Sequence, residues 1–278
     1  MSSDLPVPGR AMRTDPTVPV GPEATLRIAE GIAWIELDRP ARGNALSAQM
    51  VETLLGAVRI ACGDPSVHTI AFAASGRHFC TGFDLGGLED IGEGDLLLRF
   101  VRVETLLDAV WRAPVRTVAI ATGRAWGAGA DLFAACDLRI AAADASFRFP
   151  GAAFGIVLGT RRLAERIGTE RARQWVTTGA TLDADAAASA GLASRVAAPA
   201  DGGTALDAWR EALADGPAVD RETLAAIRAA SRPAGGPGGD ALADADLAAL
   251  VRSAARPGLK ARILAYRERS RAAPRAGD

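Results

Sequence analysis

The sequence predicts an α/β fold with parallel strand pairing and a helical C-terminal region, and three observations support this prediction. Short apolar segments rich in β-branched residues alternate with segments whose apolar residues follow helical spacing. Strand–helix units recur roughly every 45 to 50 residues, as in a coiled, repeated layout. After Gly159 the apolar pattern becomes helical.

The individual elements follow from the same patterns. Strands are expected where short apolar runs end at turn residues: two within residues 24–38, joined at Glu30–Gly31, then residues 69–73, 115–121 and 138–141. Helices are expected over residues 48–61, 96–111, 131–136, 160–167, 170–176, 182–190, 241–252 and 259–272. Ser47 is the expected N-cap of the first helix, and the glycine-rich stretch 233–239 is an expected flexible break.

Composition excludes several classes of protein. The 32 basic and 33 acidic residues give a formal charge of −1, which argues against a nucleic-acid partner bound by bulk positive charge. No run of about 18 apolar residues is present, so a membrane-spanning helix is not expected. Residues 1–23 lack the apolar core of a secretory signal and are expected to be a disordered leader. Three widely spaced cysteines indicate no disulfide framework and fit a cytoplasmic location.

The inventory of reactive side chains is small. The chain has 2 His, 1 Tyr and a single lysine, Lys260. A His-rich metal site is therefore not expected, and neither is a mechanism that needs several lysines. We expect no metal and no bound cofactor.

Two glycine-containing segments can supply main-chain N–H groups to an anion. The first is the loop 75–85, which follows an expected strand, and the second is residues 126–131, where small residues open a helix. Unpaired N–H groups at a helix start favour negative charge, and small residues let a ligand approach the backbone. Asp131 lies in the first turn of that helix, where a carboxylate can also simply complement the helix dipole.

These segments resemble the crotonase family (the enoyl-CoA hydratase/isomerase superfamily). Residues 79–85, Phe-Cys-Thr-Gly-Phe-Asp-Leu, are similar to the family's F-x-x-G-x-D-L loop, and residues 127–131 with Cys136–Asp137 are similar to its G-G-G-x-E…C-D stretch. Arg39–Pro40 and residues 44–46 match an early R-P…N-A-L pattern. The resemblance covers residues 24–196 and implies a crotonase-like spiral of strand-strand-helix repeats.

The resemblance implies an acyl-CoA thioester enzyme. Its oxyanion hole is expected from the backbone N–H groups of Phe83 and Ala128, which would stabilise a thioester enolate or a tetrahedral oxyanion. Asp131 stands where the family carries its first catalytic glutamate. Gly151 stands where the family carries the second, and the loop that follows is about three residues shorter. Asp131 is thus the single evident acid/base, and hydratase activity itself is in doubt.

The remaining site residues are also carried over from the resemblance. The acyl pocket is expected from Leu85, Leu88, Phe149 and Gly151. Coenzyme A, as part of the substrate, is expected to contact Arg42, Ala45, Arg77, Asp84, Lys260 and Tyr266, the last two from a neighbouring subunit's tail. His78 and Glu89 lie near the expected oxyanion hole without a clear role.

Several alternatives remain open at this point. The chain is either an enoyl-CoA hydratase/isomerase-type enzyme of fatty acid metabolism, a divergent CoA-thioester isomerase, decarboxylase or hydrolase, or a non-catalytic acyl-CoA-binding protein. A serine peptidase of related architecture needs Ser, His and Asp on separate elements, for which two histidines leave little choice. We expect a spiral core over residues 24–198 and a C-terminal helical region over 199–278 that serves assembly into a homotrimer or homohexamer.

Overall fold

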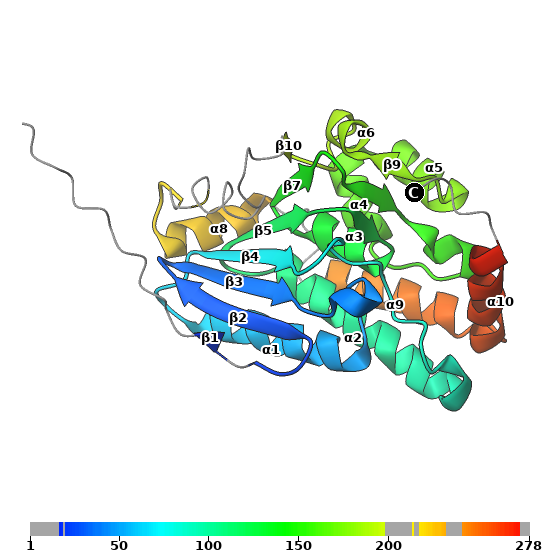
Figure 1. Cartoon of the computed structure of the whole chain (residues 1–278). Coiled ribbons are helices and arrows are strands. Elements are labelled where there is room, and N and C mark those ends of the chain that lie inside the picture. The colour runs from blue at the N-terminus through cyan, green and yellow to red at the C-terminus, as the bar shows by residue number, and fades with distance from the viewer. Residues whose placement is uncertain (1–16, 19, 198–212, 214–216, 232–240, 273–278) are drawn as a thin grey trace, which may run out of the picture.

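The computed structural model describes residues 17–18, 20–197, 213, 217–231 and 241–272, and its strands form two sheets (Figure 1). The larger sheet has the order β1-β2-β3-β4-β5-β7-β10, and β6, β8 and β9 form the smaller one. The strands are Thr17–Val18 (β1), Ala24–Ala29 (β2), Ile32–Leu37 (β3), Thr69–Ala74 (β4), Arg116–Ala121 (β5), Arg124–Trp126 (β6), Leu138–Ala142 (β7), Ser146–Arg148 (β8), Leu182–Asp183 (β9) and Arg195–Ala197 (β10).

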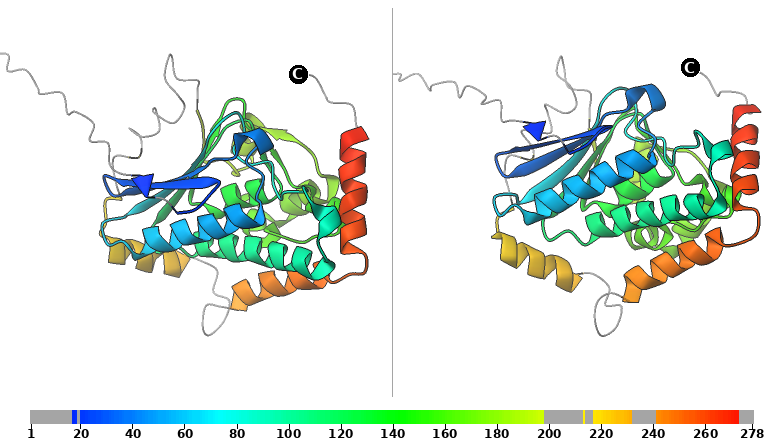
Figure 2. Two further views of the ribbon diagram at one scale, coloured as in Figure 1. Left: turned by 60° about the horizontal axis from the view of Figure 1, so that its bottom comes forward. Right: turned by 90° about the horizontal axis from the view of Figure 1, so that it is seen from below.

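The helices pack against these sheets and against each other. They are Ala48–Gly63 (α1), Glu93–Trp111 (α2), Ala128–Ala135 (α3), Thr160–Ile167 (α4), Thr169–Thr178 (α5), Ala184–Ser189 (α6), Arg221–Ser231 (α8), Ala241–Ala254 (α9) and Leu259–Ala272 (α10), with short 3₁₀ turns at Pro40–Arg42 (η1), Leu88–Asp90 (η2) and Pro150–Phe154 (η3). Helices α1 and α2 lie side by side along one face of the larger sheet, and α9 packs under α2 (Figure 2). None of the described helices is both long and apolar enough to span a membrane.

The predicted α/β class with parallel pairing is confirmed. Strand β3 pairs in parallel with β4, β4 with β5, β5 with β7, and β7 with β10. Among the described strands, the pairs β1–β2 and β2–β3 of the larger sheet and the pair β8–β9 of the smaller sheet are antiparallel. Helix α1 begins where expected, because Ser47 Oγ accepts a hydrogen bond from Met50 N at 3.0 Å.

The structure corrects the prediction at a few elements. Residues 182–190 are not one helix: Leu182 pairs with β8, and Asp183 caps α6 by accepting a hydrogen bond from Ala186 N at 2.8 Å. The expected leader, residues 1–23, is ordered near its end, because β1 pairs with β2 and Thr53 donates a hydrogen bond to Pro22 O. The short strands β6, β8 and β10 and helix α8 were not predicted. The expected break at residues 233–239 lies outside the described residues.

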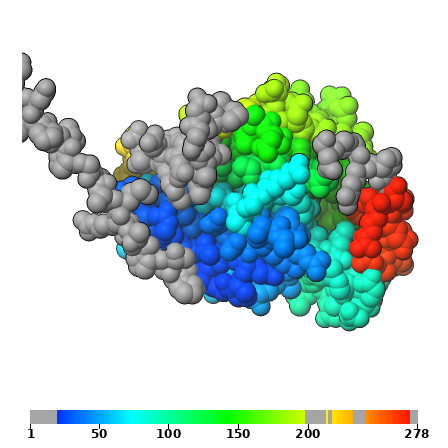
Figure 3. Space-filling view, in the orientation of Figure 1, coloured from blue at the N-terminus to red at the C-terminus, as the bar shows by residue number. Residues whose placement is uncertain are grey.

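The C-terminal helices cover one end of the core. Apolar side chains of α9 and α10 form a cluster with residues of α2, η2 and η3, among them Leu88, Leu96, Phe100, Phe154, Leu250 and Ile263. In the space-filling view, α10 forms one end of the molecule beside the start of α2 (Figure 3). The C-terminal region therefore packs on its own chain over the end where the predicted site lies.

Two backbone segments, residues 80–83 and 126–129, cross in close contact beside the start of α3. Cys80 forms a β-bridge with Ala125, and Trp126 N donates to Cys80 O at 2.9 Å. A Cβ atom added at Gly82 would lie 2.8 Å from Trp126 O. A Cβ atom added at Gly129 would lie 2.7 Å from Cys80 Cβ and overlap the Cys80 carbonyl oxygen. Only glycine permits this approach.

This crossing predicts a large and local stability effect. Gly129→Ala should lower the free energy of unfolding by more than about 2 kcal/mol, because the new methyl group overlaps backbone that cannot rotate away. Gly56→Ala is the matched control, because Gly56 lies inside α1 with no atom within 4 Å of the added Cβ atom. It should stabilise the chain by about 0.5 to 1 kcal/mol. Urea denaturation of both variants measures the difference, and equal effects would contradict the close crossing.

Candidate active site

The backbone around Phe83 aims its N–H group into the crossing. Leu46 N donates a hydrogen bond to Gly82 O at 2.8 Å, and Asp84 N donates to Leu46 O at 3.0 Å. Because a trans peptide places its N–H opposite its C=O, the Phe83 N–H points away from Leu46, towards the segment that leads into α3. Among the described residues, the Phe83 N–H has no hydrogen-bond acceptor.

The Ala128 N–H lies at the N-terminus of α3. Asp131 N donates to Gly127 O at 2.9 Å, so the peptide that joins Gly127 to Ala128 is helical and its N–H points out of the helix start. No acceptor for the Ala128 N–H occurs within the described part of the chain. The far end of α3 is held by Arg166, whose Nε and Nη2 donate to Ala134 O and Cys136 O.

The two free donors are brought together by the glycine crossing. Gly82, just before Phe83, packs on Trp126 and Gly127, which come just before Ala128. Two convergent N–H groups at a helix N-terminus can bind a carbonyl oxygen that gains negative charge. Phe83 and Ala128, the two residues expected to form an oxyanion hole, thus lie on segments that touch at Gly82.

Asp131 lies one helical turn after Ala128 and is buried. Its side chain is 6% exposed. Burial raises the pKa of its carboxyl well above the usual range, the charge of Glu104 raises the pKa further, and Arg162 opposes both effects. The carboxyl of Asp131 is thereby favoured in its neutral form, in which it can donate a proton.

Gly159 covers the Asp131 carboxyl. A Cβ atom at Gly159 would overlap Asp131 Oδ1 and lie 2.6 Å from Asp131 Cγ. Gly159 is the N-cap of α4 and has a φ of 65°, a conformation that suits glycine. The shortened loop before α4 thus brings main chain directly onto the expected acid.

Gly151 lies in η3 and offers no functional group. A Cβ atom there would lie 3.2 Å from Ile156 O, so even a methyl group would require the backbone at Ile156 to shift slightly. The second carboxylate expected of a hydratase is therefore missing from this position.

A second buried acid, Glu104 on α2, was missed by the sequence analysis. It is 3% exposed and forms an ion pair of 2.6 Å with Arg162 of α4, which is 1% exposed. Burial raises the pKa of Glu104, and Arg162 opposes this rise. The sequence offered one sign of this buried acid: Glu104 is a charged residue on the same helix face as the apolar residues Phe100, Val103 and Leu107. The pair fixes α2 to α4 beside Asp131.

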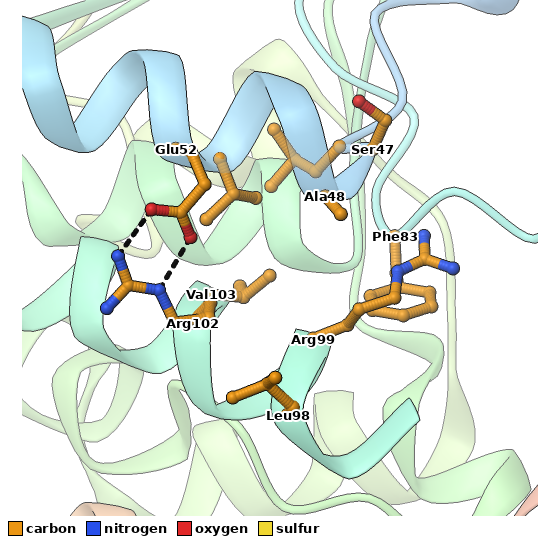
Figure 4. A pocket seen from close by; sticks show the side chains of 10 residues that line it. Ser47, Ala48, Glu52, Phe83, Leu98, Arg99, Arg102 and Val103 are labelled. Carbon is orange, nitrogen blue, oxygen red and sulfur yellow. Dashed lines mark hydrogen bonds and ion pairs between the residues drawn. The ribbon is translucent and has the colours of Figure 1, made fainter. Parts of the chain in front are cut away.

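The predicted acyl-pocket residues Leu85, Leu88 and Phe149 do not line the cavity between α1 and α2. Leu88 is fully buried in the cluster with α9 and α10, Leu85 packs against that cluster, and Phe149 belongs to the central core. One cavity in the described part of the chain lies between α1 and α2, and the side chain of Phe83 lines it (Figure 4). Its volume is about 400 Å³, including the part open to solvent, and its lining is mostly apolar.

The rim of this cavity carries two arginines. The Arg99 guanidinium lies 4.4 Å from the ring centre of Phe83, and Arg102 forms a two-pronged ion pair with Glu52 (Figure 4). The Phe83 ring stacks on Phe100 at a centroid distance of 4.2 Å. Phe83 thus contributes its N–H to the hole and its ring to the cavity wall.

The predicted CoA contacts fall into two groups. Arg42 and Arg77 are exposed on neighbouring loops, since Gly76 packs on Pro40 and Gly43 packs on Thr81. Ala45 is buried between them and the site.

The other predicted contacts are engaged within the chain. Asp84 accepts a hydrogen bond from Arg39 at 2.7 Å. Lys260 Nζ donates to Glu89 O and Ile91 O, and the Tyr266 ring packs on Phe154. Lys260 and Tyr266 therefore anchor α10 to the chain that carries them.

Neither Cys80 nor His78 supplies a reactive group here. Burial raises the pKa of the Cys80 thiol to about 12, which keeps it protonated. His78 Nδ1 accepts a hydrogen bond from Arg124 N at 3.2 Å, and burial lowers the pKa of its ring. Within the described ranges no group of three His, Cys, Asp or Glu side chains could hold a metal ion.

Comparison with known proteins decides the family. The sequence pattern of enoyl-CoA hydratase/isomerase matches residues 27–262. The chain belongs to the enoyl-CoA hydratase/isomerase family. A probable enoyl-CoA hydratase of Mycobacterium leprae is 39% identical over 179 residues, which cover 62% of this chain and 70% of that protein.

Solved structures of this family share the fold. A protein from Bordetella parapertussis assigned as an enoyl-CoA hydratase/isomerase has 41% identity and a TM-score of 0.81, covering 88% of this chain and 98% of its own. An enoyl-CoA hydratase from Bacillus halodurans has 22% identity and a TM-score of 0.74, covering 87% and 99%, and this similarity concerns the fold alone. The crotonase-type fold predicted from the motifs is confirmed.

The buried carboxyl of this family member predicts a pH effect on stability. Because the folded state holds the Asp131 proton more tightly than the unfolded state, wild-type stability should fall as pH rises above about 4, towards the raised pKa. Asp131→Asn removes the titrating group. The stability of Asp131→Asn minus that of wild type should therefore increase with pH, by up to about 1.4 kcal/mol per unit. Urea denaturation between pH 4 and 8 measures this difference, and a difference that decreases with pH would show that Asp131 is ionised in the folded chain.

Proposed function

We propose that this chain binds acyl-CoA thioesters with the thioester carbonyl oxygen between the N–H groups of Phe83 and Ala128. The single observation that carries this proposal is the pair of unpaired, convergent main-chain donors at the start of α3. Each such donor contributes about 3 kcal/mol when the oxygen becomes an oxyanion. The names of the relatives supply the substrate class, since they are called enoyl-CoA hydratases.

The chemistry we propose uses one acid/base rather than two. In a decarboxylase, neutral Asp131 would protonate the thioester enolate that loss of CO₂ leaves in the hole. In an isomerase, ionised Asp131 would take a proton from one carbon to form the enolate and return it to another carbon. Addition of water needs a second group to activate the water molecule. Gly151 has no side chain for that step, so hydration of the double bond is not the proposed reaction.

A non-catalytic acyl-CoA-binding protein is the second candidate. The contact of Gly159 with the Asp131 carboxyl favours it, because a covered acid cannot reach a substrate carbon without movement of the loop before α4. Both candidates use the same oxyanion hole. They differ in whether a proton moves at the α-carbon of the acyl group.

The rest of the ligand is assigned by the same proposal. The acyl chain would occupy the apolar cavity between α1 and α2, since Phe83 borders both this cavity and the hole. Arg42 and Arg77, exposed on adjoining loops, would contact the CoA phosphates. Self-assembly would use the C-terminal helices, which expose Ile227 and Leu247.

Calorimetry with matched ligands tests the binding step. An acyl-CoA thioester should bind at least about tenfold tighter than the corresponding S-alkyl-CoA thioether, which keeps the CoA and the chain but lacks the carbonyl oxygen. Equal affinities would refute the oxyanion hole and with it both candidates.

Exchange of the α-protons in D₂O, followed by NMR, separates the two candidates. An enzyme should exchange them faster as pH rises, because a larger fraction of Asp131 then carries the charge that removes a proton. Exchange should be absent in Asp131→Asn. Tight thioester binding without exchange in the wild type would identify a binding protein instead.

A further inference from the structure

Three arginines from distant parts of the chain converge on the two residues that follow Phe83. Arg39, after β3, donates a hydrogen bond to Asp84 Oδ2 at 2.7 Å. Arg99 of α2 donates to Asp84 O at 2.9 Å, and Arg267 of α10 donates to Leu85 O at 3.2 Å. Exposed Gly86 and Gly87 separate this stretch from η2, which begins at the buried Leu88.

These contacts fix consecutive peptide groups next to the proposed donor. Leu46 sets the orientation of the peptide group that carries the Phe83 N–H. Arg99 then holds the carbonyl of Asp84, and Arg267 holds the carbonyl of Leu85. A guanidinium is planar and presents several N–H groups at once, which lets one side chain restrain a carbonyl firmly.

Arg267 differs from the other two because it belongs to the C-terminal helix. Its guanidinium is 16% exposed and also pairs with Glu89 of η2. Helix α10 is held in place separately by Arg262, which donates to Phe154 O at 3.0 Å and to Pro257 O at 2.5 Å. The docking of α10 and the contact with Leu85 can therefore be changed independently.

We infer that Arg267 is a positioning residue for the oxyanion hole: α10, through the hydrogen bond from Arg267 to Leu85 O, holds the Phe83 N–H in register with the Ala128 N–H of the same chain. The inference rests on the proposed thioester site. It gives the C-terminal helix a role inside its own subunit, in addition to the assembly role expected from the sequence. Arg267 does not touch the substrate and acts through the loop 83–85.

The test compares two arginines of one helix by calorimetry with an acyl-CoA thioester and its S-alkyl-CoA thioether. Arg267→Ala should reduce the preference for the thioester by about tenfold, since one of the two donors becomes misplaced. Its affinity for the thioether should stay within about twofold of wild type. Arg262→Ala, which loosens α10 without touching residues 83–85, should lower the melting temperature and keep the preference.

Each possible result either supports or overturns the inference about Arg267. Loss of the preference in Arg267→Ala alone supports the inference. An unchanged preference in Arg267→Ala, or an equal loss in both variants, overturns it, because the helix would then contribute only packing. A wild-type chain without any preference refutes the proposed function itself, a result that the variants cannot imitate.

Discussion

The close crossing of two backbone segments, residues 80–83 and 126–129, is the constraint on which the rest of the site depends. Gly82 and Gly129 allow main chain to touch main chain, and the β-bridge between Cys80 and Ala125 fixes the register. Phe83 and Ala128 follow directly on the two residues, Gly82 and Gly127, that pack together at this crossing. Helix α3 is anchored behind them by Arg166, so the donors are held without any reactive side chain.

The proposed thioester site needs few reactive side chains. In that proposal the main-chain donors would stabilise the negative charge on the oxygen, and the dipole of α3 would add to this effect. Burial and Glu104 raise the pKa of the Asp131 carboxyl, Arg162 opposes this rise, and Gly159 lies directly over the carboxyl. Around this buried acid the Glu104–Arg162 ion pair ties α2 to α4. The candidate site therefore has one buried acid with a raised pKa and no carboxylate at Gly151.

The sequence predicted what depends on local patterns. Ser47 marked the start of α1, and the small residues before Asp131 marked the start of α3. Strands β6 and β8 have three residues each, which is too short for an alternation of apolar and polar residues to be recognised in the sequence. The sequence pattern could not predict contacts between residues far apart in the chain. Examples are Glu104 with Arg162, 58 positions apart, and Arg267 with Leu85, 182 positions apart. The packing of Leu88 and Phe149, which leaves them outside the cavity, is also a tertiary property.

The central claim is that the two main-chain N–H groups polarise a thioester carbonyl. The most direct measurement is the ¹³C chemical shift of an acyl-CoA labelled at the thioester carbonyl carbon, recorded free and bound to the wild-type chain. Hydrogen bonds from Phe83 and Ala128 should move the bound signal downfield of the free one. A bound ligand whose carbonyl signal stays at its free position, or moves upfield, would contradict the account.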